Sequence, residues 1–184
     1  MNSTLDGRTI LLLSSNFGTE TDEIRGPIAA LRDAGATVTV AAPETGVIAT
    51  LERDRKPGPE VPVDAAHDSV KAADFDALVL PGGTLNADAL RGDETAQFLA
   101  RAFAADGKPV AAICHAPWLL VETGLADGRE LTSVPTIRTD LVNAGGRWAD
   151  EEVVVDDSAG FRVITSRTPD DLDAFNAAII DALS

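Results

Sequence analysis

Cysteine is almost absent from this chain, and its scarcity restricts both chemistry and compartment. The 184 residues contain one cysteine, Cys114, so no internal disulfide can form. Disulfides belong mainly to oxidising compartments, and a chain without one suits a reducing cytoplasm. The first residues, MNSTLDGRT, have no basic segment followed by an apolar stretch, which is the pattern of a signal peptide. We therefore expect a cytoplasmic protein.

Long apolar runs and clusters of metal ligands are also missing. No apolar run approaches the ~20 residues that a helix needs to span a bilayer. The two histidines, His67 and His115, lie far apart in the sequence, and with a single cysteine they give no metal-ligand spacing. We expect no metal and no other cofactor. His67 lies in a polar region and is predicted to be a solvated surface residue.

Positive charge is scarce as well. The chain has 15 Lys and Arg against 30 Asp and Glu, a net charge of −15. So acidic a surface repels nucleic acid and anionic membranes, and we expect neither as a partner. Simple solubility accounts for this charge. A second hypothesis is a salt-rich cytosol, whose ions would screen the self-repulsion.

The rest of the composition is that of one ordinary globular domain. At 19.1 kDa and with 45% hydrophobic residues, the chain can bury a substantial core. Short apolar runs alternate with segments of helical periodicity. Strands are predicted within 8–15, 37–42, 75–80, 109–113, 131–134, 152–155 and 161–166, and helices over 24–35, 93–106, 117–124, 139–144 and after Pro169.

This alternation predicts an α/β fold with a mostly parallel, doubly wound sheet over residues 1–184. Residues 16–21 are predicted as a loop, 44–62 as irregular structure or a hairpin off the main sheet, and the strands at 152–155 and 161–166 as a hairpin. Pro27 is expected in the first turn of its helix. The helix over 93–106 is expected to turn Phe98 and Phe103 inward, and the last helix Leu172, Phe175, Ile179 and Ile180.

The segment KPVAAICHAPWLLVETG, residues 108–124, is the most informative of the chain. A short buried strand ends at Ile113, and an apolar helical pattern follows almost at once. Cys114 therefore lies on a tight turn between strand and helix, as the nucleophile of an elbow does. A helix N-terminus favours a thiolate, so we expect Cys114 to be partly ionised near neutral pH. A lone cysteine is often a small buried hydrophobe, but the adjoining His115 favours the reactive interpretation.

Three unusual loops are expected to meet, because ligands bind at the carboxyl ends of parallel strands. Glu20 and Glu23 follow the first strand, a glycine pair follows the third, and Cys114 with His115 follows the fourth. A carboxyl group after the first strand is suited to orient the thiol. Acidic residues are also favoured before any helix by its dipole, so this signal is not specific.

The glycine pair, Gly82 and Gly83, lets backbone N–H groups approach a ligand and form half of an oxyanion hole. The N–H of His115 would form the other half. A glycine pair after a strand is also typical of a simple turn. No histidine follows His115, whereas class I glutamine amidotransferases and α/β-hydrolases need one well downstream of the nucleophile. These two enzyme classes are therefore excluded.

The motifs together resemble the ThiJ/PfpI superfamily, and specifically its PfpI-like branch. The resemblance covers nearly the whole chain and rests on FDALVLPGG (75–83), NADALR (86–91), GKPVAAICHAPWLLVETG (107–124), NAGGRW (143–148), EEVVVD (151–156) and TSRTPDDL (165–172). It implies a flavodoxin-like three-layer sandwich related to that of the class I glutamine amidotransferases. It also implies a homodimer or a larger homo-oligomer.

The resemblance further assigns roles to residues. Cys114 matches the nucleophile, His115 the adjoining histidine and Glu23 the carboxyl that contacts the cysteine, while Glu20 matches a second acid of the same loop. Asp88 matches a carboxylate that orients the histidine across a subunit interface, although it is one methylene shorter than the usual Glu. Ala116 replaces a common glycine and is expected to narrow the pocket beside the sulfur.

These roles predict a cysteine-dependent hydrolase or lyase. The resemblance implies reactive carbonyl adducts, as for a deglycase or glyoxalase, or small peptides as its substrates, in stress protection. The alternative is a redox-sensing stress protein or chaperone without enzymatic activity, in which the same cysteine is oxidised and held by Glu23. Both hypotheses use the same residues, so the sequence leaves both open.

Overall fold

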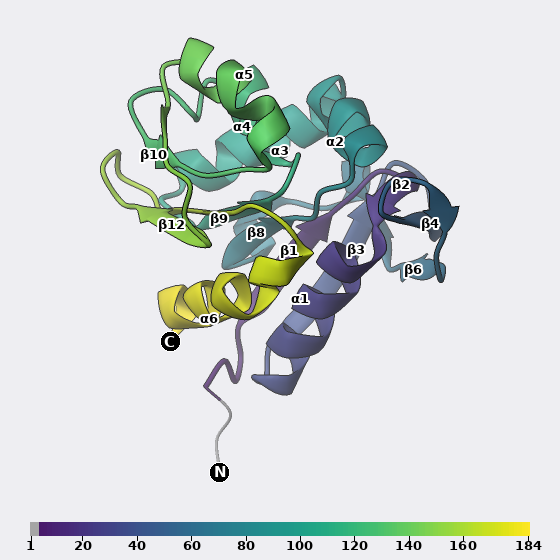
Figure 1. Ribbon diagram of the computed structural model, residues 1–184. Coiled ribbons are helices and arrows are strands. Elements are labelled where there is room, and N and C mark those ends of the chain that lie inside the picture. Colours follow the sequence, from purple (N-terminus) through teal and green to yellow (C-terminus); the bar gives the residue numbers. More distant parts are fainter. Residues whose placement is uncertain (1–3) are drawn as a thin grey trace.

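A seven-stranded sheet forms the middle layer of the molecule in the computed structural model, which describes residues 4–184 (Figure 1). Its strands are β1 (Thr9–Leu13), β3 (Thr37–Ala42), β7 (Ala65–Ala66), β8 (Ala77–Leu80), β9 (Val110–Ile113), β12 (Val153–Asp156) and β13 (Val163–Ser166). They lie in the order β12-β13-β9-β8-β1-β3-β7. Every neighbouring pair is parallel except β12 and β13, which form the predicted antiparallel pair.

The order of the central strands explains where a site can form. Numbered along the chain, β1, β3, β8, β9 and β13 are arranged 2-1-3-4-5, the flavodoxin-like order. The direction of winding reverses between β1 and β8, and ligands bind at the carboxyl ends of strands near such a point. The predicted fold class, an α/β three-layer sandwich with a mostly parallel sheet, is confirmed.

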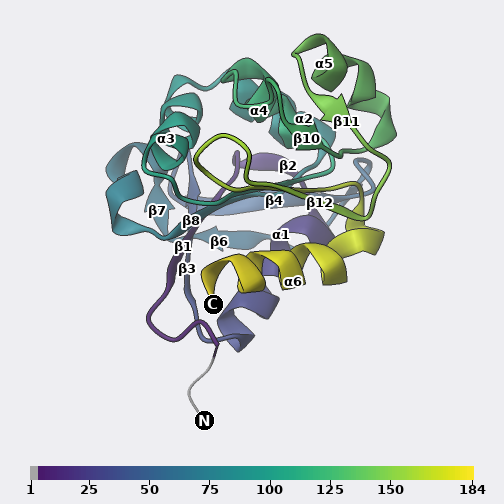
Figure 2. The same cartoon turned by 90° about the vertical axis from the view of Figure 1, so that its left-hand side faces the viewer.

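Helices cover both faces of this sheet (Figure 2). On one face lie α1 (Thr21–Asp33) and α6 (Leu172–Leu183), and on the other α2 (Thr84–Arg91), α3 (Glu94–Ala105), α4 (Pro117–Glu122) and α5 (Arg138–Asn143). Single 3₁₀ turns occur at His67–Ser69, Ala72–Asp74, Pro135–Ile137 and Pro169–Asp171. No helix within residues 4–184 has both the length and the apolar character that crossing a bilayer requires.

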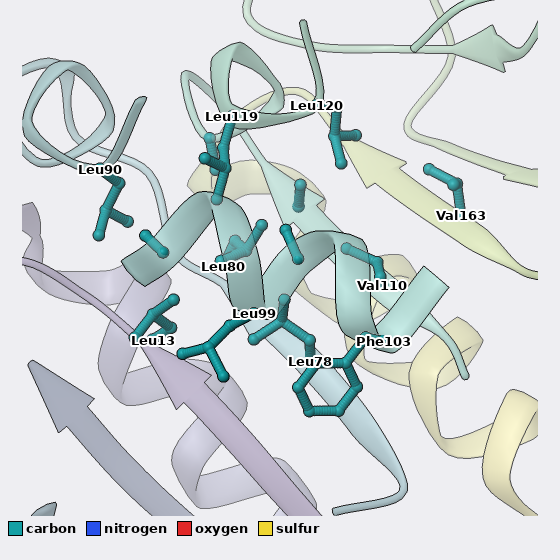
Figure 3. Packing of buried hydrophobic residues seen from close by; sticks show 14 of the residues in the cluster. Leu13, Leu78, Leu80, Leu90, Leu99, Phe103, Val110, Leu119, Leu120 and Val163 are labelled. Atoms are coloured by element: carbon teal, nitrogen blue, oxygen red, sulfur yellow. The ribbon is translucent and has the colours of Figure 1, made fainter. Parts of the chain in front are cut away.

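The core consists of two apolar layers, because alternate residues of a strand point to opposite faces. Leu11 and Leu13 of β1 pack toward α3 and α4, whereas Ile10 and Leu12 pack toward α1 and α6. Figure 3 shows the first layer, where Leu78 and Leu80 of β8 meet Leu99 and Phe103 of α3. The strands are buried on both faces, so they read as continuous apolar runs in the sequence.

Two small sheets lie outside the main one. The first contains β2 (Phe17–Glu20), β4 (Gly46–Glu52), β5 (Lys56–Pro57) and β6 (Val61–Val63), and the second contains β10 (Glu130–Leu131) and β11 (Arg147–Trp148). The antiparallel pairing of β4 with β5 and β6 confirms the predicted hairpin. The predicted loop over residues 16–21 was wrong, since β2 pairs in parallel with β4 there. Of the predicted strand over 131–134, only Leu131 lies in a strand, as the second residue of β10.

Two expectations about helices were also wrong. Pro27 lies in the interior of α1, where its missing N–H leaves the Glu23 carbonyl without the usual helical partner. The complete burial of Ile24 and Leu31 on the same helix holds it in place despite this loss. Phe98 is 69% exposed, because the inward stripe of α3 runs through Leu99 and Phe103, one position away.

His67 is buried, with 7% of its surface exposed, instead of being solvated. Its Nε2 lies 3.6 Å from Oδ2 of Asp93. Asp93 caps α3 by accepting from the backbone N–H of Thr95 and of Ala96. The polar neighbours of His67 in the sequence gave no sign of this packing, which depends on α3.

Candidate active site

Cys114 occupies a strained elbow directly after β9. Its φ is +63°, a left-handed conformation that residues other than glycine rarely adopt. The backbone N–H of Cys114 donates to the Ser166 carbonyl at 3.0 Å, and its carbonyl accepts from the N–H of Val134 at 3.1 Å. These bonds to two separate segments hold the turn in its conformation. The predicted strand-to-helix elbow is therefore present, with α4 beginning at Pro117.

Glu23 lies beside the sulfur in an apolar setting. The residue is fully buried, and neither carboxyl oxygen has a hydrogen-bond partner of normal geometry within residues 4–184. Burial raises the pKa of Glu23 to about 8, and contacts with the Cys114 thiol and the Gly82 backbone only partly oppose this increase. Glu23 is therefore protonated at neutral pH and can donate a hydrogen bond.

Burial raises the pKa of the Cys114 thiol too, and an ionised Glu23 would raise it further. Glu23 keeps its proton at neutral pH, however, and a protonated carboxyl stabilises a neighbouring thiolate. The backbone N–H of His115 is directed at the same sulfur and lowers the thiol pKa. Burial therefore favours the neutral thiol, and the His115 N–H and a protonated Glu23 are the two groups that favour the thiolate.

His115 is held between the sulfur and two hydroxyl groups. Its Nδ1 lies 3.3 Å from Sγ of Cys114. Its Nε2 lies 3.3 Å from Oγ1 of Thr84 and 3.5 Å from Oγ1 of Thr136. Burial lowers the pKa of His115, while the negative charge of Asp54 acts in the opposite direction. The ring is therefore placed to exchange a proton with the sulfur.

A tight turn between β4 and β5 brings Asp54 into this site. Asp54 accepts from the N–H of Thr84 at 2.9 Å and from its hydroxyl at 2.8 Å. The turn contains two residues at positive φ, Arg53 at +54° and Asp54 at +57°. Glu20 accepts from the backbone N–H groups of both, at 3.0 and 3.2 Å. The side chain of Glu20 thus anchors the turn, and of these two acids only Glu23 contacts the sulfur.

Gly82 and Gly83, which follow β8, are each required to be glycine for a different structural reason. A Cβ on Gly82 would lie 2.3 Å from Oε2 of Glu23 and 2.8 Å from Cβ of Cys114. A Cβ on Gly83, whose φ is +90°, would lie 2.3 Å from the Gly18 carbonyl oxygen. Glycine at both positions therefore lets the loop pack against the carboxyl–thiol pair and against β2. An oxyanion role for their N–H groups stays a prediction.

Two further predicted residues have no side-chain polar contact with Cys114 within residues 4–184. Ala116 is 2% exposed and packs in the apolar layer beneath α4. Asp88 is exposed on α2 and forms no ion pair or side-chain hydrogen bond within residues 4–184. The structure thus brings together Cys114, His115 and Glu23. It adds Asp54 and Thr84, which no motif in the sequence marked.

These features define an α/β protein with a cysteine on a strand-to-helix elbow, an adjoining histidine and a buried acid. The chain belongs to the DJ-1/PfpI family, whose model matches residues 8–182.

Relatives and solved structures agree with this assignment. The chain is 42% identical over 173 residues to "Putative cysteine protease YraA" of Bacillus subtilis, covering 94% of this chain and 96% of the relative. It is 42% identical over 166 residues to "Protein/nucleic acid deglycase 2" of Escherichia coli, covering 90% of this chain and 91% of the relative. The crystal structure of Drosophila melanogaster DJ-1beta matches with a TM-score of 0.84 and 32% identity, over 96% of this chain and 91% of that one.

Proposed function

We propose that this protein is a cysteine-dependent hydrolase or lyase that acts on reactive carbonyl adducts or small peptides in stress protection. The observation that carries the proposal is the elbow itself, in which Sγ of Cys114 has Nδ1 of His115 at 3.3 Å and a protonated acid beside it. Relatives named as a cysteine protease and as a protein/nucleic acid deglycase support both substrate classes.

In the proposed reaction, Sγ of Cys114 adds to a carbonyl carbon. The new S–C bond forms as the π electrons of the carbonyl move to its oxygen, and His115 carries the proton between sulfur and the product oxygen or leaving group. The backbone N–H of Gly83 is proposed to stabilise the oxyanion. The N–H of His115 is directed at Sγ in this structure, so we assign it to the thiolate.

Turnover measurements test this proposal. We expect the wild type to consume methylglyoxal, a methylglyoxal-modified peptide or a fluorogenic peptide, and Cys114→Ala to lose this activity by at least a hundredfold. Comparing the three substrates distinguishes glyoxalase, deglycase and peptidase chemistry. No turnover of any of them above the Cys114→Ala background would refute the enzymatic proposal.

A redox-sensing role is the second candidate, and the buried Glu23 favours it. A protonated carboxyl with no other partner within residues 4–184 is suited to donate to an oxygen on sulfur. In this case hydrogen peroxide oxidises the thiolate to a sulfenic acid and is itself reduced to water. Mass spectrometry after peroxide treatment should then show one added oxygen in wild type and less of it in Glu23→Ala. The redox role is supported only if such oxidation occurs without substrate turnover.

We also propose that the protein acts as a homodimer in which Asp88 of one copy reaches His115 of the other. Asp88 is exposed on α2, and Leu85 of the same helix and Phe17 of β2 are exposed apolar residues, at 49% and 56%. A Cβ on Gly18 would lie 2.5 Å from Cβ of Leu85, which shows that β2 and α2 share this face. Exposed apolar residues beside an unpaired acid fit an interface between copies.

Mixing two inactive variants tests the shared site. Mixed dimers of Asp88→Ala and Cys114→Ala contain one site with intact Cys114, His115 and a donated Asp88, so activity should partly return. If mixed dimers form but remain as inactive as the parents, Asp88 does not act across the interface.

The single cysteine, needed as a free thiol, is consistent with a reducing compartment, and the cytoplasmic location stays a prediction.

A further inference from the structure

The hydroxyl of Thr84 lies between the carboxylate of Asp54 and the ring of His115. Thr84 carries one hydroxyl proton, and Oδ2 of Asp54 lies 2.8 Å from this hydroxyl. A carboxylate can only accept, so Thr84 must donate its proton to Asp54. The oxygen of Thr84 is then left with lone pairs toward Nε2 of His115, 3.3 Å away.

An acceptor at Nε2 determines which ring nitrogen carries the proton. A neutral imidazole has one donor nitrogen and one acceptor nitrogen, and its tautomer is set by its hydrogen-bond partners. With the proton on Nε2, the lone pair of Nδ1 faces Sγ of Cys114 at 3.3 Å. This is the tautomer in which Nδ1 can take a proton from the sulfur side.

We propose that Asp54, acting through the hydroxyl of Thr84, is a positioning residue that holds the proton of His115 on Nε2 and turns Nδ1 toward Cys114. This inference rests on the proposed function, since it specifies how the proton-carrying His115 is prepared. It also assigns a role to Glu20, which holds the backbone of the turn on which Asp54 is carried.

The strain in this turn supports the proposal. Arg53 and Asp54 both adopt the left-handed conformation without being glycine, which strains the backbone of the turn. The carboxyl of Glu20 offsets this strain by accepting from both N–H groups, and it is only 8% exposed. The result is a defined position for Asp54, whose second oxygen also accepts from the N–H of Thr84 at 2.9 Å.

Thr136 provides a contrast within the same site. Its hydroxyl lies 3.5 Å from Nε2, but within residues 4–184 it has no carboxylate partner. This hydroxyl is therefore free to donate or to accept, and it does not select a tautomer. Thr136→Val is the matched control for Thr84→Val, because both variants remove one hydroxyl next to the same nitrogen.

Nitrogen NMR of the imidazole tests the proposal without any substrate. The two histidines of the chain are assigned by comparison with a His67→Gln variant, at a pH where the ring of His115 is neutral. We expect the Nε2–H tautomer in wild type and Thr84→Ser. In Thr84→Val its ratio to the Nδ1–H form should fall about fivefold, and it should also fall in Asp54→Asn. Thr136→Val should keep the wild-type ratio.

Each of the other outcomes has a definite consequence. An unchanged ratio in Thr84→Val, with the fold intact by thermal unfolding, overturns the inference. If the ratio of the Nε2–H to the Nδ1–H form falls in Asp88→Ala but not in Thr84→Val, Asp88 of the partner copy sets the tautomer. This result also overturns the inference. Failure of the enzymatic proposal is seen separately, because turnover can be absent while the tautomer still responds to Thr84 and Asp54.

Discussion

Glu23 and Cys114 form a buried pair, and we expect its protonation to control the proposed chemistry of the site. The carboxyl holds its proton because burial disfavours its charge, and it can then donate to sulfur. Below a pH of about 8 the Glu23 carboxyl is protonated and can donate a hydrogen bond, and above it the carboxylate can only accept one. Two predictions at the scale of single residues follow from this behaviour.

The first concerns the reactivity of the thiol. Burial raises the pKa of the Cys114 thiol, whereas the His115 N–H and a protonated Glu23 stabilise the thiolate. We expect the two donors to outweigh burial, so that alkylation of Cys114 by iodoacetamide shows an inflection below about 8.5, the value of a free thiol. Glu23→Gln keeps a donor and should shift the inflection less than Glu23→Ala does. An inflection at or above the free-thiol value in the wild type would show that burial outweighs these donors and that the thiol is neutral at pH 7.

The second prediction concerns stability. The pKa of Glu23 is raised from 4.5 to about 8 in the folded protein, so between these values the unfolded chain releases a proton that the folded chain keeps. The contribution of Glu23 to stability therefore falls as pH rises through this range. Glu23→Gln removes the effect and should be the more stable protein at pH 8, by an amount on the order of 3 kcal/mol. Urea unfolding at several pH values measures the difference, and parallel curves for the two proteins would contradict the prediction.

At the scale of elements, a buried ion pair ties β12 to the segment before β10. Arg129 is 1% exposed, and its Nη1 donates to Oδ1 of Asp156 at 3.0 Å and to the Phe161 carbonyl at 3.0 Å. Asp156 also accepts from the N–H of Glu130 at 2.8 Å. Burial opposes ionisation of Asp156, but hydrogen bonds from Ser158 and Glu130 and the charge of Arg129 outweigh it and lower the pKa to about 2.

Removing this carboxylate should destabilise the protein strongly. Asp156→Asn leaves the charge of Arg129 buried without its partner, which costs on the order of 3 to 5 kcal/mol. Asp157→Asn is the control, because its pair with Arg162 is 57% exposed on the Asp side and should be worth less than about 1 kcal/mol. The contribution of Asp156 is complete above its ordinary pKa of 3.8 and should be lost as pH falls toward about 2. Equal losses of unfolding free energy in the two variants would show that the buried pair stabilises the protein no more than the exposed pair does.

At the scale of the whole molecule, the net charge of −15 is the dominant feature. Much of this charge is on the surface, where it repels itself and is screened by salt within about 10 Å at 0.1 M. If the acidity is an adaptation to a salt-rich cytosol, the free energy of unfolding should rise between low salt and molar KCl. A flat or falling stability over this range would leave solubility as the explanation.

Much of the molecule could be predicted from the pattern of residues along the chain. The runs Ile10–Leu13 and Ala77–Leu80 are apolar throughout, which is typical of strands buried on both faces, and they form β1 and β8. The elbow at Cys114 was predicted because its strand and helix adjoin it in the sequence. Local structure of this kind is determined by residues that are neighbours in the sequence.

Side-chain environment depended instead on segments far apart in the chain. His67 is buried against α3, and Glu20 anchors a turn 33 residues away in sequence at Arg53. The Asp54–Thr84 contact joins residues 30 positions apart, one in the β4–β5 turn and one at the start of α2. The sequence by itself determined the fold class and the Cys114–His115 pair, because periodicity and adjacency carry that information, whereas the choice of Glu23 over Glu20 was implied by the family resemblance. Only the tertiary structure decided which acid meets which nitrogen, since hydrogen-bond direction is set by groups that folding alone brings together.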